Sequence, residues 1–367
     1  MSRAHDLPVL KASIHDIKYF SALLRGVNFA NVSRATVTVT EKGLLVVVEE
    51  SRTLLGTAYI FSDVFDEFIY HAESENQASQ QGQTTDQEIF SAFEIPLNNF
   101  LELLNIFGTA GGSTSSRTGR YKAWKKSGDE SDEHESEGGE GEGDREGGNT
   151  NKKKAGPLFG GAERKTGMRL TYIGPGYPLT VIVAEDASGP TTTCEIATFD
   201  AEDHLELPFD SEQMALKIIL KSSWLRDALS ELDPSCDKLT FIGNPSEALD
   251  TGAQTARQRQ RARLQATPNF RIEATGTFGN TEMDYPNDRD VLESFECLAP
   301  VSFSYRFSHI TRTMRAMQTS VKTSLRIDNE GLLSLQFLMP SSAPRMNSGG
   351  GTSNFIEFRC LALEEDA

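Results

Sequence analysis

Apolar residues recur along the chain at two spacings, one typical of helices and one typical of strands. Helical spacing occurs in four short stretches, two in each half of the chain. We predict these helices to begin at Ser13, to span Pro96–Phe107, to run from Ser222 or Ser223 to Leu232, and to span Ser308–Thr319. Short runs rich in Val, Ile, Leu, Thr and Phe between them predict strands joined by Gly-bearing turns. Each half therefore has the same order: helix, strands, helix, strands.

The repeat is visible in the letters of the sequence. LTYIGPGYPLTVIV follows the second helix and LRIDNEGLLSLQFL follows the fourth, and both predict a strand, a turn and a strand. Helices of roughly eleven residues are marginal alone, so each must lie on a sheet. The expected fold class is α+β, with helices on one face of largely antiparallel sheets.

An acidic stretch, Thr198–Asp210 (TFDAEDHLELPFD), separates the halves and has no sustained helical or strand period. We interpret residues 199–210 as a connector between a first domain, 7–198, and a second domain, 211–365.

Two polar inserts interrupt these domains. Residues 111–165 are rich in Gly, Ser and Glu and are predicted to be disordered, because they cannot form a core. Ser127, Ser131 and Ser136 lie among acids there and are candidates for phosphorylation. The second insert, 246–267, is rich in Arg and is a candidate for contact with DNA or anionic partners.

Composition narrows the class of protein. The 367 residues contain no apolar run long enough for a membrane span. Four cysteines stand far apart without a CxxC motif, which suits reduced thiols in cytosol or nucleus and argues against structural zinc. The Gly174–Gly176 turn is not a phosphate loop, because no GKS or GKT follows it, and no cofactor is expected. The net charge of −17 disfavours general adhesion to nucleic acid but permits a local basic surface.

Five strings occur in order along the chain: FLELLNIFG, GYPLTVIV, KIILKSSWLRDALSELD, FRIEATGTFGNTEMDYP and SLRIDNEGLLSLQF. This series resembles the PCNA-like DNA sliding clamp family and, within it, the Rad-one type subunit of the heterotrimeric nine-one-one DNA damage checkpoint clamp. The resemblance covers about Leu7 to Glu365 without the two inserts. Its specificity lies in the order of the strings, since sliding clamps are poor in short motifs.

The resemblance implies a ring of three two-domain subunits in the nucleus, with helices lining a central channel and sheets outside. The other subunits would be of the Rad-nine and Hus-one types. Further partners would be the checkpoint clamp loader, double-stranded DNA near single-strand junctions, and repair and checkpoint proteins. No membrane partner is expected. The chain would be a non-catalytic subunit that encircles damaged DNA and recruits checkpoint signalling and repair factors.

An acidic protein that encircles DNA needs its cations on the inner helices, where sequence-blind phosphate contact is strongly salt-dependent. The second helix offers no cation. The alternative interpretation is an ordinary solvated helix face. The DNA-facing candidates are Lys18, Arg25, Lys221, Arg226, Arg312, Arg315 and Lys322.

Clamp subunits join by edge strands, which implies strand addition at Thr192–Thr198 and at Asn280–Tyr285. The alternative is a covered or charged edge within a monomer. The candidate edge residues are Thr192, Cys194, Ile196, Thr198, Asn280, Glu282 and Asp284.

A clamp partner peptide usually occupies a hydrophobic pocket beneath the connector. The candidate residues for such a site are Asp200, His204, Leu205, Leu207 and Pro208.

The rival interpretation is a 3'-5' exodeoxyribonuclease acting in DNA repair, because members of this branch have been described as exonucleases. Two-metal nuclease chemistry needs several carboxylates that converge on rigid elements. The clusters nearest to this requirement lie in predicted loops without a recognisable nuclease spacing, so no catalytic or metal residues are assigned. These clusters are Asp200, Glu202, Asp203 and His204, and Asp284, Asp288 and Asp290.

Overall fold

The computed structural model describes residues 7–29, 32, 34–72, 90–108, 165–185, 189–245, 268–340 and 354–364. All of them belong to one compact unit, 1–112 with 165–367. The predicted domain boundaries therefore stay a prediction. The acidic insert, apart from Lys165, and the whole Arg-rich insert lie outside the described residues.

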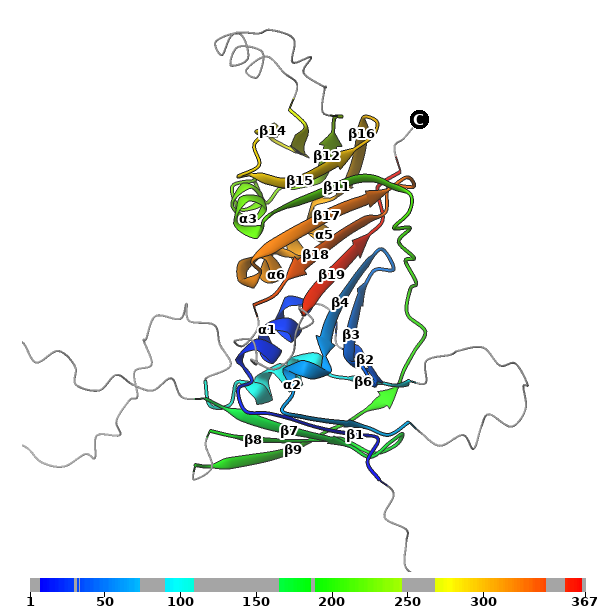
Figure 1. Ribbon diagram of the computed structural model, residues 1–367, viewed down its shortest axis with the longest axis vertical. Helices are drawn as coiled ribbons and strands as arrows, with labels where there is room; N and C mark the ends of the chain where they lie inside the picture. Colours follow the sequence, from blue (N-terminus) through cyan, green and yellow to red (C-terminus); the bar gives the residue numbers. More distant parts are fainter. Residues whose placement is uncertain are drawn as a thin grey trace, which may run out of the picture. The chain divides into compact units, whose positions relative to one another are not determined.

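Eleven main elements precede the connector (Figure 1). They are β1 (Leu10–Ile14), α1 (Lys18–Gly26), β2 (Ala35–Thr40), β3 (Gly43–Glu50), β4 (Leu54–Phe61), β5 (Glu67–Tyr70), β6 (Ser91–Ile95), α2 (Leu97–Leu104), β7 (Gly167–Tyr172), β8 (Leu179–Ala184) and β9 (Thr191–Ile196).

The remaining elements begin in the connector. They are β10 (Phe199–Asp200), β11 (Met214–Lys221), α3 (Ser222–Ser230), β12 (Cys236–Gly243), β13 (Phe270–Gly276), β14 (Gly279–Tyr285), β15 (Leu292–Cys297), β16 (Val301–Arg306), α5 (Phe307–Arg312), α6 (Met314–Thr319), β17 (Lys322–Asp328), β18 (Leu333–Leu338) and β19 (Phe355–Cys360).

The strands form three antiparallel sheets in the described part of the chain. Their orders are β5-β1-β7-β8-β9, β10-β6-β2-β3-β4-β19-β18-β17-β11-β15, and β14-β13-β12-β16. The run β15-β11-β17-β18-β19 repeats β5-β1-β7-β8-β9, and β16-β12-β13-β14 repeats β6-β2-β3-β4. The predicted α+β class with antiparallel sheets is confirmed, and the repeat read from the letters has the same topology in both halves.

The helices lie along one side of the ten-stranded sheet, where α3, α6, α1 and α2 follow one another (Figure 1). Helix α1 buries an apolar stripe of Phe20, Leu23 and Leu24. No helix among the described residues is long and apolar enough to cross a membrane.

The two halves meet where β4 pairs with β19, from Tyr59 opposite Phe355 to Leu54 opposite Cys360. Gly56 allows the close approach, because a Cβ atom there would lie 3.0 Å from the Phe358 ring. The ring centroids of Phe29 and Phe358 are 6.0 Å apart across this junction. Sheet and core therefore continue from one half into the other.

The predicted boundaries of all four helices need correction, and the third helix, α3, ends at Ser230 rather than Leu232. The first helix begins at Lys18 rather than Ser13, because Leu10–Ile14 are held as strand β1 between β5 and β7. The second ends at Leu104 and is followed by a turn that reaches Gly108, whose φ is 69°.

The predicted fourth helix is two helices, α5 and α6, divided at Thr313. The hydroxyl of Thr313 donates to the carbonyl oxygen of Ile310 at 2.7 Å, a local bond that competes with the helical pattern.

One prediction beside the connector is also wrong. Thr198 lies outside the edge strand, because β9 ends at Ile196 and the Thr198 hydroxyl instead donates to the carbonyl oxygen of Tyr177 at 2.8 Å. The first residues of the connector form the short strand β10, which pairs with β6.

Candidate functional site

Among the strands of the described residues, β9 and β14 each end a sheet and have one unpaired side. On β9, Thr192, Cys194 and Ile196 are more buried than their neighbours Thr193 and Glu195, so they face the core.

On β14 the alternation places Met283 on the core side of the sheet. Asn280, Glu282 and Asp284 are exposed on the opposite side. The six predicted residues other than Thr198 thus lie on two sheet edges, three inward and three outward.

These two edges are the equivalents of strands that pair inside the chain. Strand β9 occupies the position of β19 in the repeat, and β14 occupies the position of β4. Since β19 and β4 pair with each other, the junction between the halves shows how edges of these two kinds join.

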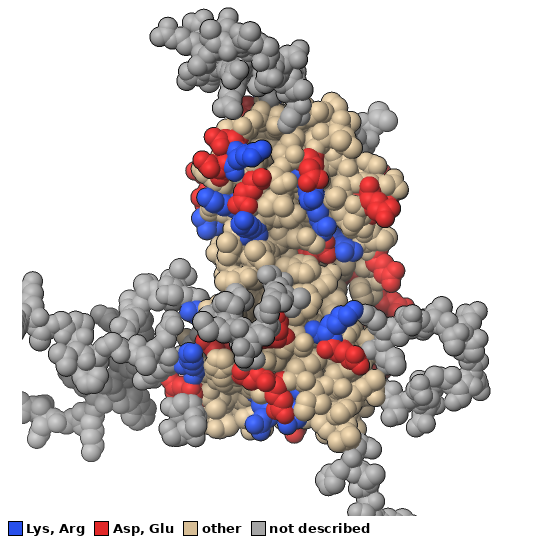
Figure 2. Space-filling model, in the orientation of Figure 1, with Lys and Arg blue, Asp and Glu red and all other residues tan. Residues whose placement is uncertain are grey.

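The predicted DNA-facing cations lie on or next to α1, α3, α5 and α6, but several are already neutralised. Arg226 pairs with Asp227 at 2.7 Å, and Lys322 pairs with Glu293 at 2.6 Å. Figure 2 likewise shows Lys and Arg side chains interspersed with Asp and Glu over the region where Figure 1 draws α3. The net positive charge of this surface is therefore smaller than a count of cations suggests.

Arg312 has a structural role that its helix position does not reveal. Its guanidinium donates two hydrogen bonds of 2.9 Å to Glu50, at the end of β3. Both side chains are mostly buried, and the pair ties α5 to the first half.

Two of the remaining cations, Lys221 and Arg315, are exposed. Arg315 also donates to the carbonyl oxygen of Asn28 at 3.3 Å, just beyond the end of α1. Lys18 and Arg25 are half-buried in α1, and burial lowers the pKa of the Arg25 guanidinium.

The connector lies on the face of the ten-stranded sheet opposite to Ile356 and Phe358. Leu207 is buried in a small apolar cluster with Val47, Leu55 and Leu332. Polar contacts fix the connector's backbone: Leu205 N–H donates to Glu49 at 2.7 Å, and the Leu207 carbonyl oxygen accepts from Arg359 at 2.7 Å. Arg326 lies 4.7 Å from the centroid of the Phe209 ring.

The Glu357 carboxylate accepts hydrogen bonds from Arg326 and Arg359, the two side chains that contact the connector. It accepts from Arg326 at 2.9 Å, from Arg359 at 2.9 Å and from the Ser334 hydroxyl at 2.7 Å. Burial alone would raise the pKa of Glu357, but the Ser334 hydrogen bond and the two guanidiniums outweigh it and hold the pKa below its ordinary value.

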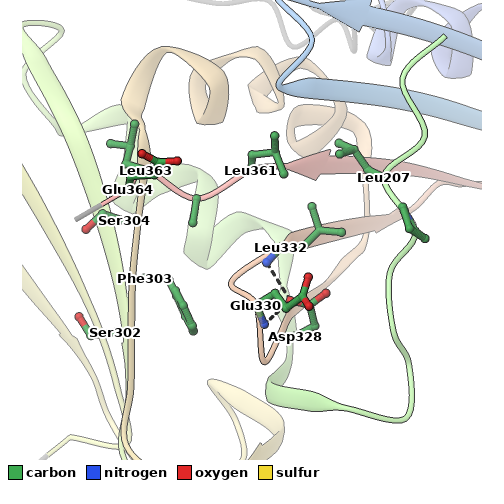
Figure 3. Close-up of a pocket in the computed structure, with 12 residues that line it drawn as sticks. Leu207, Ser302, Phe303, Ser304, Asp328, Glu330, Leu332, Leu361, Leu363 and Glu364 are labelled. Carbon is green, nitrogen blue, oxygen red and sulfur yellow. Dashed lines mark hydrogen bonds between the residues drawn. The ribbon is translucent and has the colours of Figure 1, made fainter. Parts of the chain in front are cut away.

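A pocket of about 540 Å³ opens beside the connector (Figure 3). Phe303 of β16 faces the Asp328–Leu332 turn across it, and Leu361 and Leu363 of the segment after β19 complete the apolar lining. Of the predicted connector residues, Leu207 and Pro208 line the pocket. Asp200, His204 and Leu205 do not, since Asp200 belongs to β10, His204 is exposed and Leu205 packs against the small apolar cluster.

The acidic clusters considered for nuclease chemistry do not converge. Asp284 is paired with Arg271 at 2.6 Å, and the Asp288 carboxylate accepts from the backbone N–H of Asp290 within a turn. Among the described residues, no group of three or more His, Cys, Asp or Glu side chains is placed to hold a metal ion.

One Cys/His pair was not found from the sequence. Cys360 Sγ lies 3.6 Å from His309 Nδ1, and both side chains are buried. Burial raises the pKa of the Cys360 thiol to about 12 and lowers the pKa of His309. A thiol that stays protonated at neutral pH is not a nucleophile, so this pair is a packing contact.

The family model described as repair protein Rad1/Rec1/Rad17 matches residues 9–339. The chain belongs to this family. The match confirms the resemblance to Rad-one type subunits that the ordered strings indicated.

Named relatives of the Rad1/Rec1/Rad17 family are similar in sequence to this chain over nearly its whole length. The cell cycle checkpoint protein RAD1 of Mus musculus is 28% identical over 97% of this chain and 93% of its own length. The DNA damage checkpoint control protein rad1 of Schizosaccharomyces pombe is 28% identical over 95% of this chain and 84% of its own length. The DNA repair exonuclease REC1 of Mycosarcoma maydis is 26% identical over 98% of this chain and 97% of its own length.

A solved structure supports the fold independently of the sequence. Proliferating cellular nuclear antigen from Entamoeba histolytica covers 98% of this chain and 100% of its own, with a TM-score of 0.59 and 12% identity. The Rad1/Rec1/Rad17 chain thus has the PCNA-like clamp fold that the resemblance implied.

Replacing Glu357 by Gln should destabilise the protein by about 3 kcal/mol at pH 7, because Arg326 and Arg359 lose their buried anionic partner. The depressed pKa of Glu357 gives stability that is present above the ordinary value of 4.5 and is lost as pH falls through the folded-state pKa. Urea unfolding from pH 7 down to pH 3 should therefore show the difference between wild type and Glu357→Gln shrinking below about pH 4.

The half-exposed pair of Lys11 with Glu67 provides the control, and Glu67→Gln should cost less than about 1 kcal/mol. Equal costs for the two Gln variants would contradict a structural role for the buried carboxylate.

Proposed function

We propose that this chain is a non-catalytic subunit of a nuclear, heterotrimeric sliding clamp that encircles damaged DNA and recruits checkpoint and repair factors. The observation that carries the proposal is the β4–β19 junction, whose two strand types recur unpaired as β14 and β9. Family membership and the clamp fold support it.

The two edges provide the means of ring closure. β9 would add to the β14-like edge of one neighbour, and β14 to the β9-like edge of the other, as in strand addition. Contacts between unlike surfaces of neighbouring subunits close into a ring when the rotation permits. Rad-nine and Hus-one type subunits are the proposed neighbours, with the checkpoint clamp loader acting on the assembled ring.

DNA would pass along the helices. Lys221 and Arg315 are the most accessible candidates for phosphate contact, and α2 supplies Asn98, Asn99 and Glu102 instead of cations. Ion pairing of Arg226, Arg312 and Lys322 limits what those cations add, so retention on DNA would come mainly from encirclement.

The pocket beside the connector is the proposed site for a partner peptide. Phe303, Leu332 and Leu361 supply an apolar lining, while the Arg326, Arg359 and Glu357 contacts hold the adjacent connector in place. A small number of polar groups around an apolar floor is typical of binding sites for short segments.

One relative is named an exonuclease, so exonuclease activity is the alternative function for this chain. The non-catalytic role is favoured because the described carboxylates are dispersed or ion-paired rather than convergent. Degradation of DNA by the purified chain with Mg²⁺ or Mn²⁺ would overturn this part of the proposal.

The ring is tested by co-expression with Rad-nine and Hus-one type subunits and light scattering after size exclusion. Wild type should give a one-to-one-to-one complex. Met283→Asp should lose only the neighbour at β14, and Thr192→Asp only the neighbour at β9, each weakened on the order of 100-fold by a charge placed on the buried side of the new sheet.

Thr171→Asp, on the interior strand β7, is the matched control and should assemble normally. Retention of one neighbour shows that each variant is folded. A chain that binds neither subunit, or edge variants that assemble as wild type does, would sink the ring proposal.

Phosphate contact is tested by the salt dependence of DNA binding by the assembled complex. Combining Lys221→Glu and Arg315→Glu should lower the slope of log affinity against log salt by about 2. Lys238→Glu, on β12, should leave the slope unchanged. An unaltered slope in the double variant would contradict contact through these two side chains.

Peptide binding is tested with immobilised peptide tiles of repair and checkpoint proteins, measured by surface plasmon resonance. Phe303→Arg should weaken the peptides that bind wild type by about 10-fold or more, because a charge enters the apolar lining. Phe278→Arg is the control, since Phe278 is 84% exposed at the β13–β14 turn. Equal binding to both variants would place the peptide site elsewhere.

A further inference from the structure

A row of charged side chains projects from the outward face of β13 and β14. Arg271 lies 2.6 Å from Asp284, 2.8 Å from Glu282 and 3.8 Å from Glu273. Among the described residues, Arg271 is the only cation within ion-pair distance of these three carboxylates, so the row has a net charge of −2.

The row is also strained by like charges within the sheet. Glu273 and Glu282 are directly opposite each other in the β13–β14 register. Like charges in that position destabilise an antiparallel pair, and one guanidinium is shared among three carboxylates. The edge is thus short of positive charge before any neighbour arrives.

The junction inside the chain provides a register for the strand that would arrive. Matching Leu44 of β3 with Phe270 of β13 makes their hairpin partners, Ile60 of β4 and Tyr285 of β14, equivalent positions. Counting back along both strands by the same number of residues aligns Leu55 of β4 with Asn280 of β14. Matching Leu179 of β8 with Leu333 of β18 in the same way makes their partners, Ile196 of β9 and Cys360 of β19, equivalent positions.

At the internal junction the outward face is well supplied with positive charge. Arg359 of β19 lies opposite Leu55, and Glu357 lies opposite Thr57. Two guanidiniums, those of Arg359 and Arg326, surround the single Glu357 carboxylate.

A second copy of this chain would bring the wrong charge to β14. In the β19 register, its Glu195 would take the place of Arg359, opposite Asn280 and diagonal to Glu282. Thr193 would face Glu282, and Thr191 would face Asp284. Diagonal neighbours are roughly 7–8 Å apart, within reach of long side chains, so self-pairing adds a carboxylate and no cation.

We infer that the outward row of β14 selects a neighbour whose edge strand carries Lys or Arg at the positions of Thr193 and Glu195, and disfavours a second copy of this chain. This inference rests on the proposed clamp function and names the chemistry of one partner. The occupant of the β14 edge is a clamp subunit with a basic outward row, and charge keeps the assembly heteromeric.

The test converts β9 of this chain into the predicted partner. Combining Thr193→Lys with Glu195→Arg in the full chain should strengthen its self-association by about 10-fold or more at 50 mM salt, measured by sedimentation equilibrium. At 500 mM salt most of the gain should vanish, because exposed charges are screened.

Two matched variants separate charge from other effects. Thr193→Val with Glu195→Gln removes the repulsion without adding cations and should give a smaller gain. Adding Glu282→Gln and Asp284→Asn to the basic variant should abolish most of its gain. The inference is overturned if the basic variant self-associates no better than wild type, or if its gain survives loss of the β14 acids.

These outcomes are distinct from failure of the clamp proposal. If Met283→Asp loses the β14 neighbour but Glu282→Gln with Asp284→Asn binds that neighbour as wild type does, the clamp stands and charge selection falls. If no clamp subunit joins either edge, the clamp proposal itself falls.

Discussion

The backbone pairing of β4 with β19 is the constraint on which the rest of the structure depends. An unpaired strand edge presents a row of N–H and C=O groups that must find partners, and each half of this chain has one strand of the β4 kind and one of the β9 kind at such an edge. Pairing one edge from each half satisfies both and extends one sheet to ten strands. Gly56 and Phe358 make the close approach possible, and Phe29 packs over it. What the pairing leaves behind is the equivalent pair of edges, β9 and β14, at the far ends of the repeat.

The same strand that joins the halves also fixes the connector. On its core side β19 buries Ile356 and Phe358, and on its other side it presents Glu357 and Arg359. Glu357 is almost fully buried, so its two guanidinium partners are restrained, and they in turn reach Leu207 and Phe209 of the connector. A buried carboxylate with several donors is costly to disrupt, which keeps the connector in a defined place beside the pocket. The geometry of the pocket thus follows from the charges of a single strand.

Much of this fold could be predicted from periodicity and order. Apolar spacing located the helices, the Gly-bearing turns located hairpins such as β7–β8, and the ordered strings indicated the clamp fold. The errors arose where tertiary contacts override local signals: Ser13 looks like a helix start, but β5 and β7 recruit Leu10–Ile14 into a sheet. Pairing partners were out of reach, because no spacing shows that Arg312 meets Glu50 or that Cys360 meets His309. Alternation along β19 puts Glu357 and Arg359 on one face, but only the hydrogen bonds of the structure show that they hold the connector.

Steric fit and charge act on opposite faces of the free edges, and only charge discriminates against self-pairing. On the core side, β9 carries the smaller Thr192 and Cys194 where β19 carries Ile356 and Phe358, and β14 carries the larger Met283 and Thr281 where β4 carries Ala58 and Gly56. Small residues opposite larger ones would let a second copy of this chain fit. On the outward side, three carboxylates share Arg271, and β9 offers Glu195 where the internal junction offers Arg359. Backbone pairing is available to any strand, so the edges of β9 and β14 need such a device to choose between a copy of this chain and a different subunit.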